Sequence, residues 1–181
     1  MDAIQEKLKI FAPATGERLG EIPVTSVNEV DSFYHRSKTA FKQWSNLTMS
    51  ERGKYLLRLK DIIVEQMEDI AKTIAADTGK VVTEALVADI TPTLDSIDHI
   101  IKHGEKILQR QRVKTPFLLI GKKSFIEYMP RGVVLVISPW NYPFQLAMVP
   151  MLSALASGNT VILKPVRSNS TSREMYGGDF C

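Results

Sequence analysis

The chain has 181 residues, of which 44% are hydrophobic and 24% charged, and its formal net charge is +3. This length and composition fit an ordinary globular domain with a buried core and exclude a chain that is disordered throughout. The lysines and arginines are scattered along the sequence, so neither a nucleic acid nor an acidic membrane surface is an expected partner.

The single cysteine, Cys181, cannot form an intramolecular disulfide, so the sequence gives no sign of a secreted disulfide scaffold. The first residues lack the long apolar core of a signal peptide. We therefore expect a cytoplasmic protein.

The N-terminal region is predicted to form two short strands followed by helices. Residues 10–22 have the pattern of two strands around a turn. Ser26 with Glu29, and Thr48 with Glu51, fit capping boxes that begin two helices. Apolar residues then recur at helical spacing on one side, so we expect both helices to pack on a core.

Further along, Gly79 suits a left-handed C-cap that ends a helix. Thr91 and Pro92 suit the N-cap and first position of another helix. The buried side of that helix is predicted to carry Leu94, Ile97, Ile100 or Ile101, and Leu108.

The pattern changes after residue 112. Residues 117–120 and 124–129 are apolar runs that flank Gly121 and two lysines. This arrangement predicts an antiparallel hairpin with those two runs as its strands.

A strand–helix–strand unit is predicted next. Residues 133–137 form a continuous apolar run typical of a parallel strand that is buried on both faces. An apolar helix over roughly 144–157 stops at Gly158, and residues 160–163 form a second strand. Residues 132–163 carry no charge, but prolines and glycine interrupt them too often for one membrane-spanning helix.

Polar side chains follow both parallel strands. The first strand runs into Ser138 and Asn141, and the second into Lys164. Parallel strands end at the same edge of a sheet, where ligands bind in open α/β folds. There an asparagine amide could stabilise an oxyanion, and a lysine could bind a ribose hydroxyl or a phosphate. The alternative is a capping asparagine and a solvated lysine.

These residues resemble motifs of the aldehyde dehydrogenase superfamily. Residues 131–143 contain the Pro-Trp-Asn-x-Pro signature, residues 158–165 resemble the strand that follows it, and residues 77–80 resemble an upstream segment. The resemblance covers roughly residues 10–165 in the right order. The signature is most similar to the branch that acts on aromatic and fatty aldehydes.

The resemblance implies roles for individual residues. Asn141 would donate its side-chain amide to the thiohemiacetal oxyanion. Ile137 and Ser138 would line the cofactor crevice through their backbone, with Pro139 beside them, and Lys164 would contact the adenosine ribose.

Trp140 would pack beside the site, although a purely core aromatic is an equal alternative. The chain has Arg167 near the place where the family commonly has an acidic residue for the ribose 2′-hydroxyl. An arginine could accept a 2′-phosphate and favour NADP, or the difference could reflect a disturbed C-terminal segment. His99 and His103 lie four residues apart and could bind a metal, but without further ligands nearby we expect surface histidines.

The predicted fold class is α/β. It comprises N-terminal helices (1–112), a hairpin extension (113–130), a βαβ unit of an incomplete, parallel, Rossmann-like cofactor-binding sheet (131–165), and an atypical tail (166–181).

The resemblance implies NAD(P)-dependent oxidation of an aldehyde to a carboxylic acid, with NAD or NADP as cofactor, no metal, and a homo-oligomer in the full-length form. The nucleophilic cysteine, general-base glutamate and glycine-rich loop are expected downstream, so Cys181 lies too early to be the nucleophile. We therefore expect a truncated chain that is inactive alone. The alternative is a non-catalytic remnant that binds nucleotide or associates with a subunit.

Overall fold

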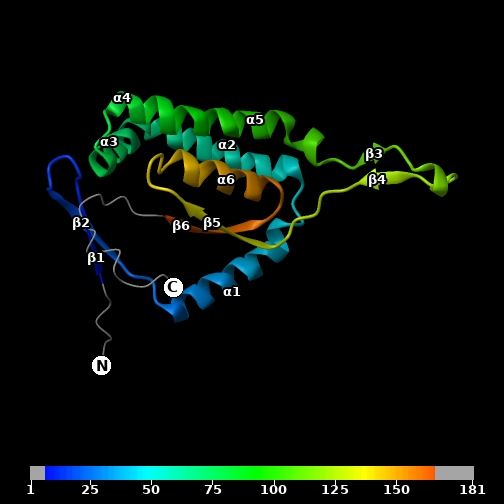
Figure 1. The fold of residues 1–181 in the computed structure, drawn as a ribbon, viewed down its shortest axis with the longest axis horizontal. Helices are drawn as coiled ribbons and strands as arrows, with labels where there is room; N and C mark the ends of the chain where they lie inside the picture. The colour runs from blue at the N-terminus through cyan, green and yellow to red at the C-terminus, as the bar shows by residue number, and fades with distance from the viewer. Residues whose placement is uncertain (1–6, 166–181) are drawn as a thin grey trace.

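The computed structural model describes residues 7–165 (Figure 1). The elements in chain order are β1 (Lys7–Phe11), β2 (Arg18–Pro23), α1 (Val27–Trp44), α2 (Met49–Glu65), α3 (Met67–Thr78), α4 (Val82–Ala85), the π-helical turn η1 (Leu86–Ile90), α5 (Thr91–Leu108), β3 (Gln111–Val113), the 3-10 turn η2 (Phe117–Leu119), β4 (Ser124–Ile126), β5 (Val133–Ser138), α6 (Gln145–Ala156) and β6 (Thr160–Pro165). The predicted α/β class is confirmed.

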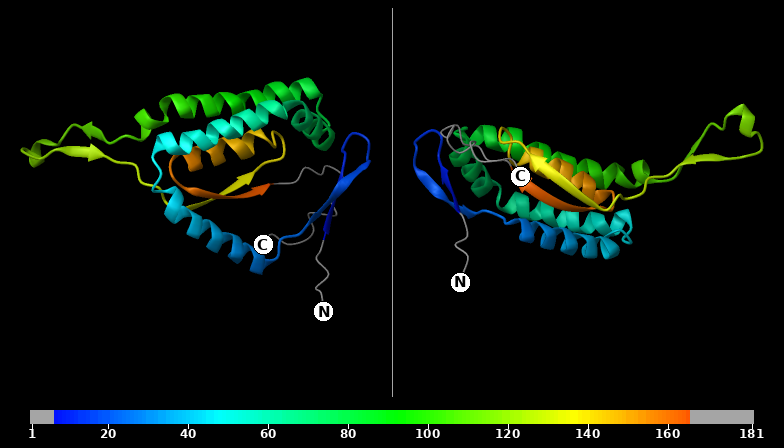
Figure 2. Two further views of the ribbon diagram at one scale, coloured as in Figure 1. Left: turned by 180° about the vertical axis from the view of Figure 1, so that it is seen from behind. Right: turned by 60° about the horizontal axis from the view of Figure 1, so that its bottom comes forward.

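The described strands form three separate pairs. β1 pairs with β2 and β3 pairs with β4, both antiparallel, whereas β5 and β6 are parallel. The βαβ unit predicted around α6 is therefore confirmed. The β3–β4 pair projects from the body as a long arm (Figures 1 and 2).

The core lies between the helices and one face of the β5–β6 pair. α6 covers that face, and α2 and α5 lie over α6 (Figure 1). The most enclosed core side chains are Leu56, Ile90, Ile97 and Leu152.

The opposite face of β5 is open. Leu135 is 57% exposed and Ile137 is 58% exposed. The prediction that this strand is buried on both faces is thus wrong for the described part of the chain, because α6 packs on one face while Leu135 and Ile137 on the other face remain exposed.

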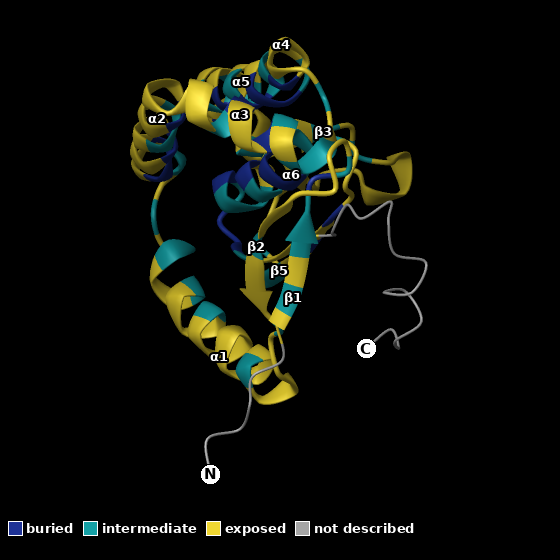
Figure 3. Cartoon of the chain, turned by 90° about the vertical axis from the view of Figure 1, so that its left-hand side faces the viewer, coloured by how far each residue is buried: buried dark blue, intermediate teal, exposed yellow. Residues whose placement is uncertain are grey.

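Helix α1 is also poorly covered. None of its residues is buried, and most of its surface is exposed (Figure 3). It is held to the βαβ unit by two hydrogen bonds: the Thr160 hydroxyl donates to the Ser37 carbonyl, and Trp44 Nε1 donates to the Leu155 carbonyl. The expected packing of its apolar stripe on a core is therefore not found, whereas α2 buries Leu56 and Ile63 of its stripe but leaves Tyr55 and Ile62 exposed.

The predicted helix ends are mostly confirmed. Both capping boxes form, Ser26 with Glu29 and Thr48 with Glu51. Hydrogen bonds from the backbone and hydroxyl of the cap residue lower the pKa of each glutamate below its ordinary value. Gly79 has a φ of +77° and ends α3 as a left-handed C-cap.

Thr91 is not an N-cap. The chain runs without a break from α4 through η1 into α5, and the Thr91 hydroxyl donates to the carbonyl of Leu86. The side-chain hydroxyl thus satisfies a carbonyl in the widened π-helical turn, and the helix begins earlier than the sequence pattern suggests.

The hairpin exists, but its predicted first strand is wrong. Phe117–Leu119 forms a 3-10 turn, and the strand that pairs with β4 is Gln111–Val113. Pro116 presets a turn: its carbonyl accepts from the Leu119 N–H at 2.9 Å. A second such bond, from the Ile120 N–H to the Phe117 carbonyl, continues the turn.

Within residues 7–165, no helix is both long enough and apolar enough to span a membrane.

Candidate functional site

The loop between β5 and α6 carries the signature residues at the carboxyl end of the sheet. Ser138 ends β5 with only 2% of its side chain exposed, whereas Pro139, Trp140 and Asn141 are exposed. Trp140 is 54% exposed, so it is not a core aromatic of the described region. The change from buried to exposed residues thus occurs immediately after the end of the strand.

The parallel register brings the second candidate beside the first. Lys164 lies opposite Ile137, and Pro165 lies opposite Ser138. The side chains of Asn141 and Lys164 are exposed, and neither has a hydrogen-bond or ion-pair partner among the described residues. Both polar groups are therefore free to meet a ligand at this edge. Arg167 lies outside the described residues.

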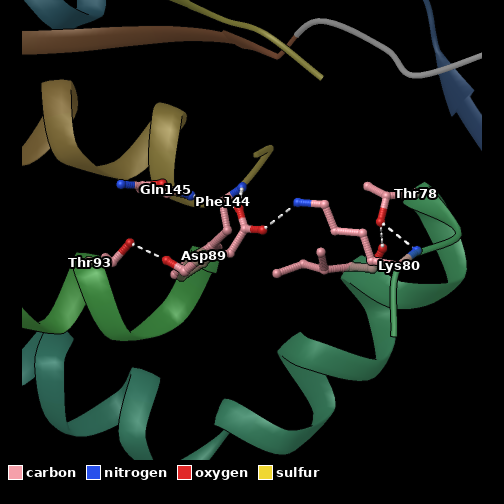
Figure 4. A network of polar contacts seen from close by, with 7 residues as sticks. Thr78, Lys80, Asp89, Thr93, Phe144 and Gln145 are labelled. Carbon is pink, nitrogen blue, oxygen red and sulfur yellow. Dashed lines mark hydrogen bonds and ion pairs between the residues drawn. The ribbon is translucent and has the colours of Figure 1, made fainter. Parts of the chain in front are cut away.

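Helix α6, which follows the signature, has no local N-cap side chain. Its N-terminus is instead capped by Asp89 of η1, which is fully buried and lies 55 residues upstream (Figure 4). Asp89 Oδ1 accepts from the backbone N–H of Phe144 at 3.1 Å and of Gln145 at 3.2 Å. A carboxylate at a helix N-terminus satisfies free N–H groups and complements the helix dipole.

Lys80 completes this cluster. Its Nζ lies 3.1 Å from Asp89 Oδ2, and it also lies 3.8 Å from the centre of the Tyr142 ring. Only 13% of the lysine side chain is exposed. The cluster thus contacts the signature loop through both the backbone after Pro143 and the ring of Tyr142.

Sequence reasoning missed Asp89, and it noted Lys80 only as part of a family-like segment. Two signals pointed to a remote acceptor. Residues 142–145, directly before and at the start of α6, include no Ser, Thr, Asp or Asn that could cap it. Asp89 is a carboxylate at a position of the helix whose neighbours at helical spacing, Leu86 and Thr93, are uncharged. Which carboxylate caps the helix depends on the tertiary fold.

The C-terminus of α6 is also held by remote side chains. Buried Arg52 donates from Nε to the Ala156 carbonyl at 2.9 Å, and it also donates to Leu47. Burial lowers the pKa of the Arg52 guanidinium, while nearby Glu51 opposes the shift. A cation at the C-terminus and an anion at the N-terminus both match the dipole of α6.

Asn159 joins the end of α6 to the start of β5. Its Oδ1 accepts from the N–H groups of Arg131 at 2.6 Å and Gly132 at 3.0 Å. Its amide donates to the Ala154 carbonyl and the Ser157 hydroxyl. Asn159, within the family-like segment 158–165, therefore holds the start of the strand that leads to the signature.

An open groove of about 870 Å³ lies elsewhere, between α1 and β6. Phe33, Trp44 and the edge of β6 line it, and none of the predicted site residues does. We place the candidate site at the strand ends because Asn141 follows β5 there and Lys164 lies opposite Ile137 at the same end of β6. Within the described ranges, no three His, Cys, Asp or Glu residues group in a way that could hold a metal ion.

Comparison with known proteins decides the family. Residues 1–176 match the sequence model of the aldehyde dehydrogenase family. The chain belongs to the aldehyde dehydrogenase family. The resemblance that the signature suggested is therefore confirmed.

Two relatives illustrate the range of the similarity. The chain is 41% identical over 155 residues to a 4,4′-diapolycopene aldehyde oxidase of Methylomonas sp, covering 85% of this chain and 29% of the relative. It is 36% identical over 170 residues to an NADP-dependent glyceraldehyde-3-phosphate dehydrogenase of Streptococcus equinus, covering 93% of this chain and 36% of the relative. The chain thus spans about a third of the length of these two relatives.

Solved aldehyde dehydrogenases share the fold. An aldehyde dehydrogenase from Brucella melitensis biovar abortus 2308 has a TM-score of 0.81 at 26% identity, covering 89% of this chain and 32% of that one. The NADP-dependent glyceraldehyde-3-phosphate dehydrogenase of Bacillus halodurans C-125, solved with NADP, has a TM-score of 0.79 at 34% identity, covering 90% of this chain and 34% of that one.

Proposed function

We propose that this chain supplies the oxyanion donor and part of the cofactor site of an enzyme that oxidises an aldehyde to a carboxylic acid with NAD or NADP. The observation that carries the proposal is the register of β5 and β6. It places Lys164 opposite Ile137, two residues before the loop that carries Asn141. Two free polar groups thus share the edge where open α/β sheets bind ligands.

Asn141 is proposed to stabilise the negative charge that develops on the aldehyde oxygen during nucleophilic attack. An amide N–H is a suitable donor because it binds an oxyanion without exchanging a proton. The exposure of Asn141 and its lack of a partner in the described region support this role, because its amide need not break an existing bond.

Lys164 is proposed to bind the adenosine ribose, beside a crevice lined by Ile137, Ser138, Pro139 and Trp140. The donor set fits a nucleotide: an unpaired ammonium and exposed backbone at a sheet edge suit hydroxyl and phosphate oxygens. When bound, the nicotinamide accepts the hydride that leaves the substrate carbon. One relative is an NADP-dependent enzyme, and one similar solved structure is a complex with nicotinamide adenine dinucleotide. The proposed cofactor is therefore NAD or NADP.

These 181 residues alone are proposed to be inactive. Family resemblance assigns the nucleophilic cysteine and general base to a later region, and a covalent mechanism without its nucleophile loses most of its rate. NADH formation with several aldehydes tests this directly. Turnover by the 181-residue chain would contradict the proposal.

The site assignment is tested in a chain extended with the downstream region of a relative. Asn141→Ala should lower kcat by about 100- to 1000-fold, the usual loss for one oxyanion donor, with little change in cofactor KM. Lys164→Ala should raise cofactor KM and largely keep kcat, because it removes a ground-state contact. If Asn141→Ala leaves kcat intact, the oxyanion role is wrong.

Matched controls come from exposed residues of the same types. Asn46→Ala and Lys72→Ala remove an exposed amide and an exposed ammonium away from the strand ends, and neither should change kcat or KM. Arg167→Glu should shift any preference for NADP toward NAD, because a carboxylate repels a 2′-phosphate and accepts from a ribose hydroxyl.

A further inference from the structure

We propose that Asp89 and Lys80 are positioning residues that hold the signature loop, and with it Asn141, at the edge of the sheet. The importance of that position for catalysis rests on the function proposed above. The positioning itself rests on the cap and the ion pair drawn in Figure 4 and on the contact of Lys80 with the Tyr142 ring.

The first contact is the cap of α6. The first N–H groups of any helix lack partners within it, and a local Ser, Thr, Asp or Asn usually accepts from them. Asp89 takes that place at 3.1 and 3.2 Å, from a side chain with no exposed surface. The first turn of α6 is therefore fixed to η1, three residues after Asn141.

The second contact is the lysine. Lys80 neutralises the buried carboxylate at 3.1 Å, and its ammonium lies against the Tyr142 ring at 3.8 Å. A cation over an aromatic face is attractive, particularly where water is largely excluded. The Tyr142 carbonyl also accepts from the Leu146 N–H at 3.0 Å. The residue next to Asn141 is thus held through both its ring and its backbone.

The π-helical turn places the carboxylate. η1 widens the helix at Asp89, and hydroxyls of neighbouring threonines satisfy carbonyls in this region: Thr91 donates to Leu86, and Thr93 donates to Asp89 itself at 2.8 Å. Such turns interrupt an ordinary helix at a cost and are frequent at functional sites. Here the turn presents the buried Asp89 carboxylate to α6, and the Thr93 hydroxyl holds the Asp89 backbone carbonyl.

Hydrogen exchange measured by mass spectrometry on the 181-residue chain tests the positioning without any activity. Asp89→Ala should speed exchange in a peptide covering 141–148 by about ten- to a hundred-fold, as expected when a bond to a charged acceptor is lost. Asp89→Asn keeps an acceptor and should give a smaller, several-fold increase. Residues 150–157, later in the same helix, should keep their rate.

Asp98 provides the matched control. It lies on α5 and pairs with Lys60 at 2.6 Å, but its side chain is 55% exposed. Asp98→Ala and Asp98→Asn should leave exchange over 141–148 unchanged. The inference is overturned if the Asp89 variants behave like the Asp98 variants, or if 150–157 speeds up as much as 141–148, which would indicate a general loss of stability. Should Asp89→Ala fail to fold, the Asp89→Asn and Asp98→Asn pair decides.

Kinetics in the extended chain separate this inference from the proposed function. Asp89→Asn should lower kcat by roughly ten-fold or more, as misplacement of a donor predicts, with cofactor KM unchanged. Asp98→Asn should change neither. If Asn141→Ala lowers kcat but Asp89→Asn does not, the positioning inference fails and the function stands. If the exchange result holds but Asn141→Ala leaves kcat intact, the function fails and the positioning stands.

Discussion

Removing the side chain of Asn159 tests how firmly the strand leading to the signature is held. Asn159 is 7% exposed and makes four hydrogen bonds. Two of them accept backbone N–H groups before β5, and two donate to the last turn of α6. Asn159→Ala removes all four; the N–H groups of Arg131 and Gly132 then lose the side-chain acceptor they share, whereas the Ala154 carbonyl still accepts from the Ser157 hydroxyl.

The structure sets the size of the effect. A hydrogen bond contributes about 1 kcal/mol net, and a buried group left without a partner costs about 1–3 kcal/mol. Water can replace part of the loss at Arg131, which is exposed, but less of it at Gly132, which is half-buried. We therefore expect Asn159→Ala to lower the free energy of unfolding by roughly 2–4 kcal/mol. Asn159→Asp keeps the acceptor toward β5 and should cost about half as much.

Urea denaturation followed by far-UV circular dichroism measures the change. Asn46→Ala is the control, because its amide makes one exposed bond to the Lys42 carbonyl, and it should stay within about 0.5 kcal/mol of the unmodified chain. The reasoning is refuted if Asn159→Ala lowers the free energy of unfolding no more than that control does. It is also refuted if Asn159→Asp lowers it as much as Asn159→Ala, since the bonds that Oδ1 accepts from Arg131 and Gly132 would then contribute nothing.

Three further outcomes are expected. Gly79→Ala should lower the free energy of unfolding by about 1 kcal/mol in the same assay, because a residue with a Cβ is unfavourable at its φ of +77°. The added Cβ would not clash, since its nearest neighbour, Pro13 Cγ, would lie 3.6 Å away. No loss would mean that the backbone relaxes. The folded-state pKa of Glu51 lies below its ordinary value of 4.5, so the stability that Glu51 contributes is present above pH 4.5 and is lost as the pH falls through the folded-state pKa. Glu51→Gln should therefore flatten this part of the curve of melting temperature against pH, and an unchanged curve would contradict the cap. The 181-residue chain should self-associate in sedimentation experiments, because Phe117 and Leu118 on the arm are 85% and 93% exposed and one face of β5 is open; a monomer with a sharp two-state melt would contradict this.

The sequence by itself determined the features that depend on near neighbours. The capping boxes at Ser26 and Thr48 involve residues three apart, and Gly79 is favoured at its cap by its own backbone freedom. The β5–α6–β6 unit follows from an apolar run, a turn and a second run along one short stretch. The signature lies inside this stretch, so its place at the sheet edge was also predictable.

Only the tertiary structure decided interactions between distant segments. Residues 117–120 are as apolar as a strand, but Pro116 begins a turn and β4 pairs with residues 111–113 instead. The cap of α6 comes from Asp89, and the carbonyls at its other end are bound by Trp44 and Arg52. Each of these partners is set by which groups the folded chain brings within hydrogen-bond distance. Because the partners lie far apart in the sequence, local sequence patterns cannot predict them.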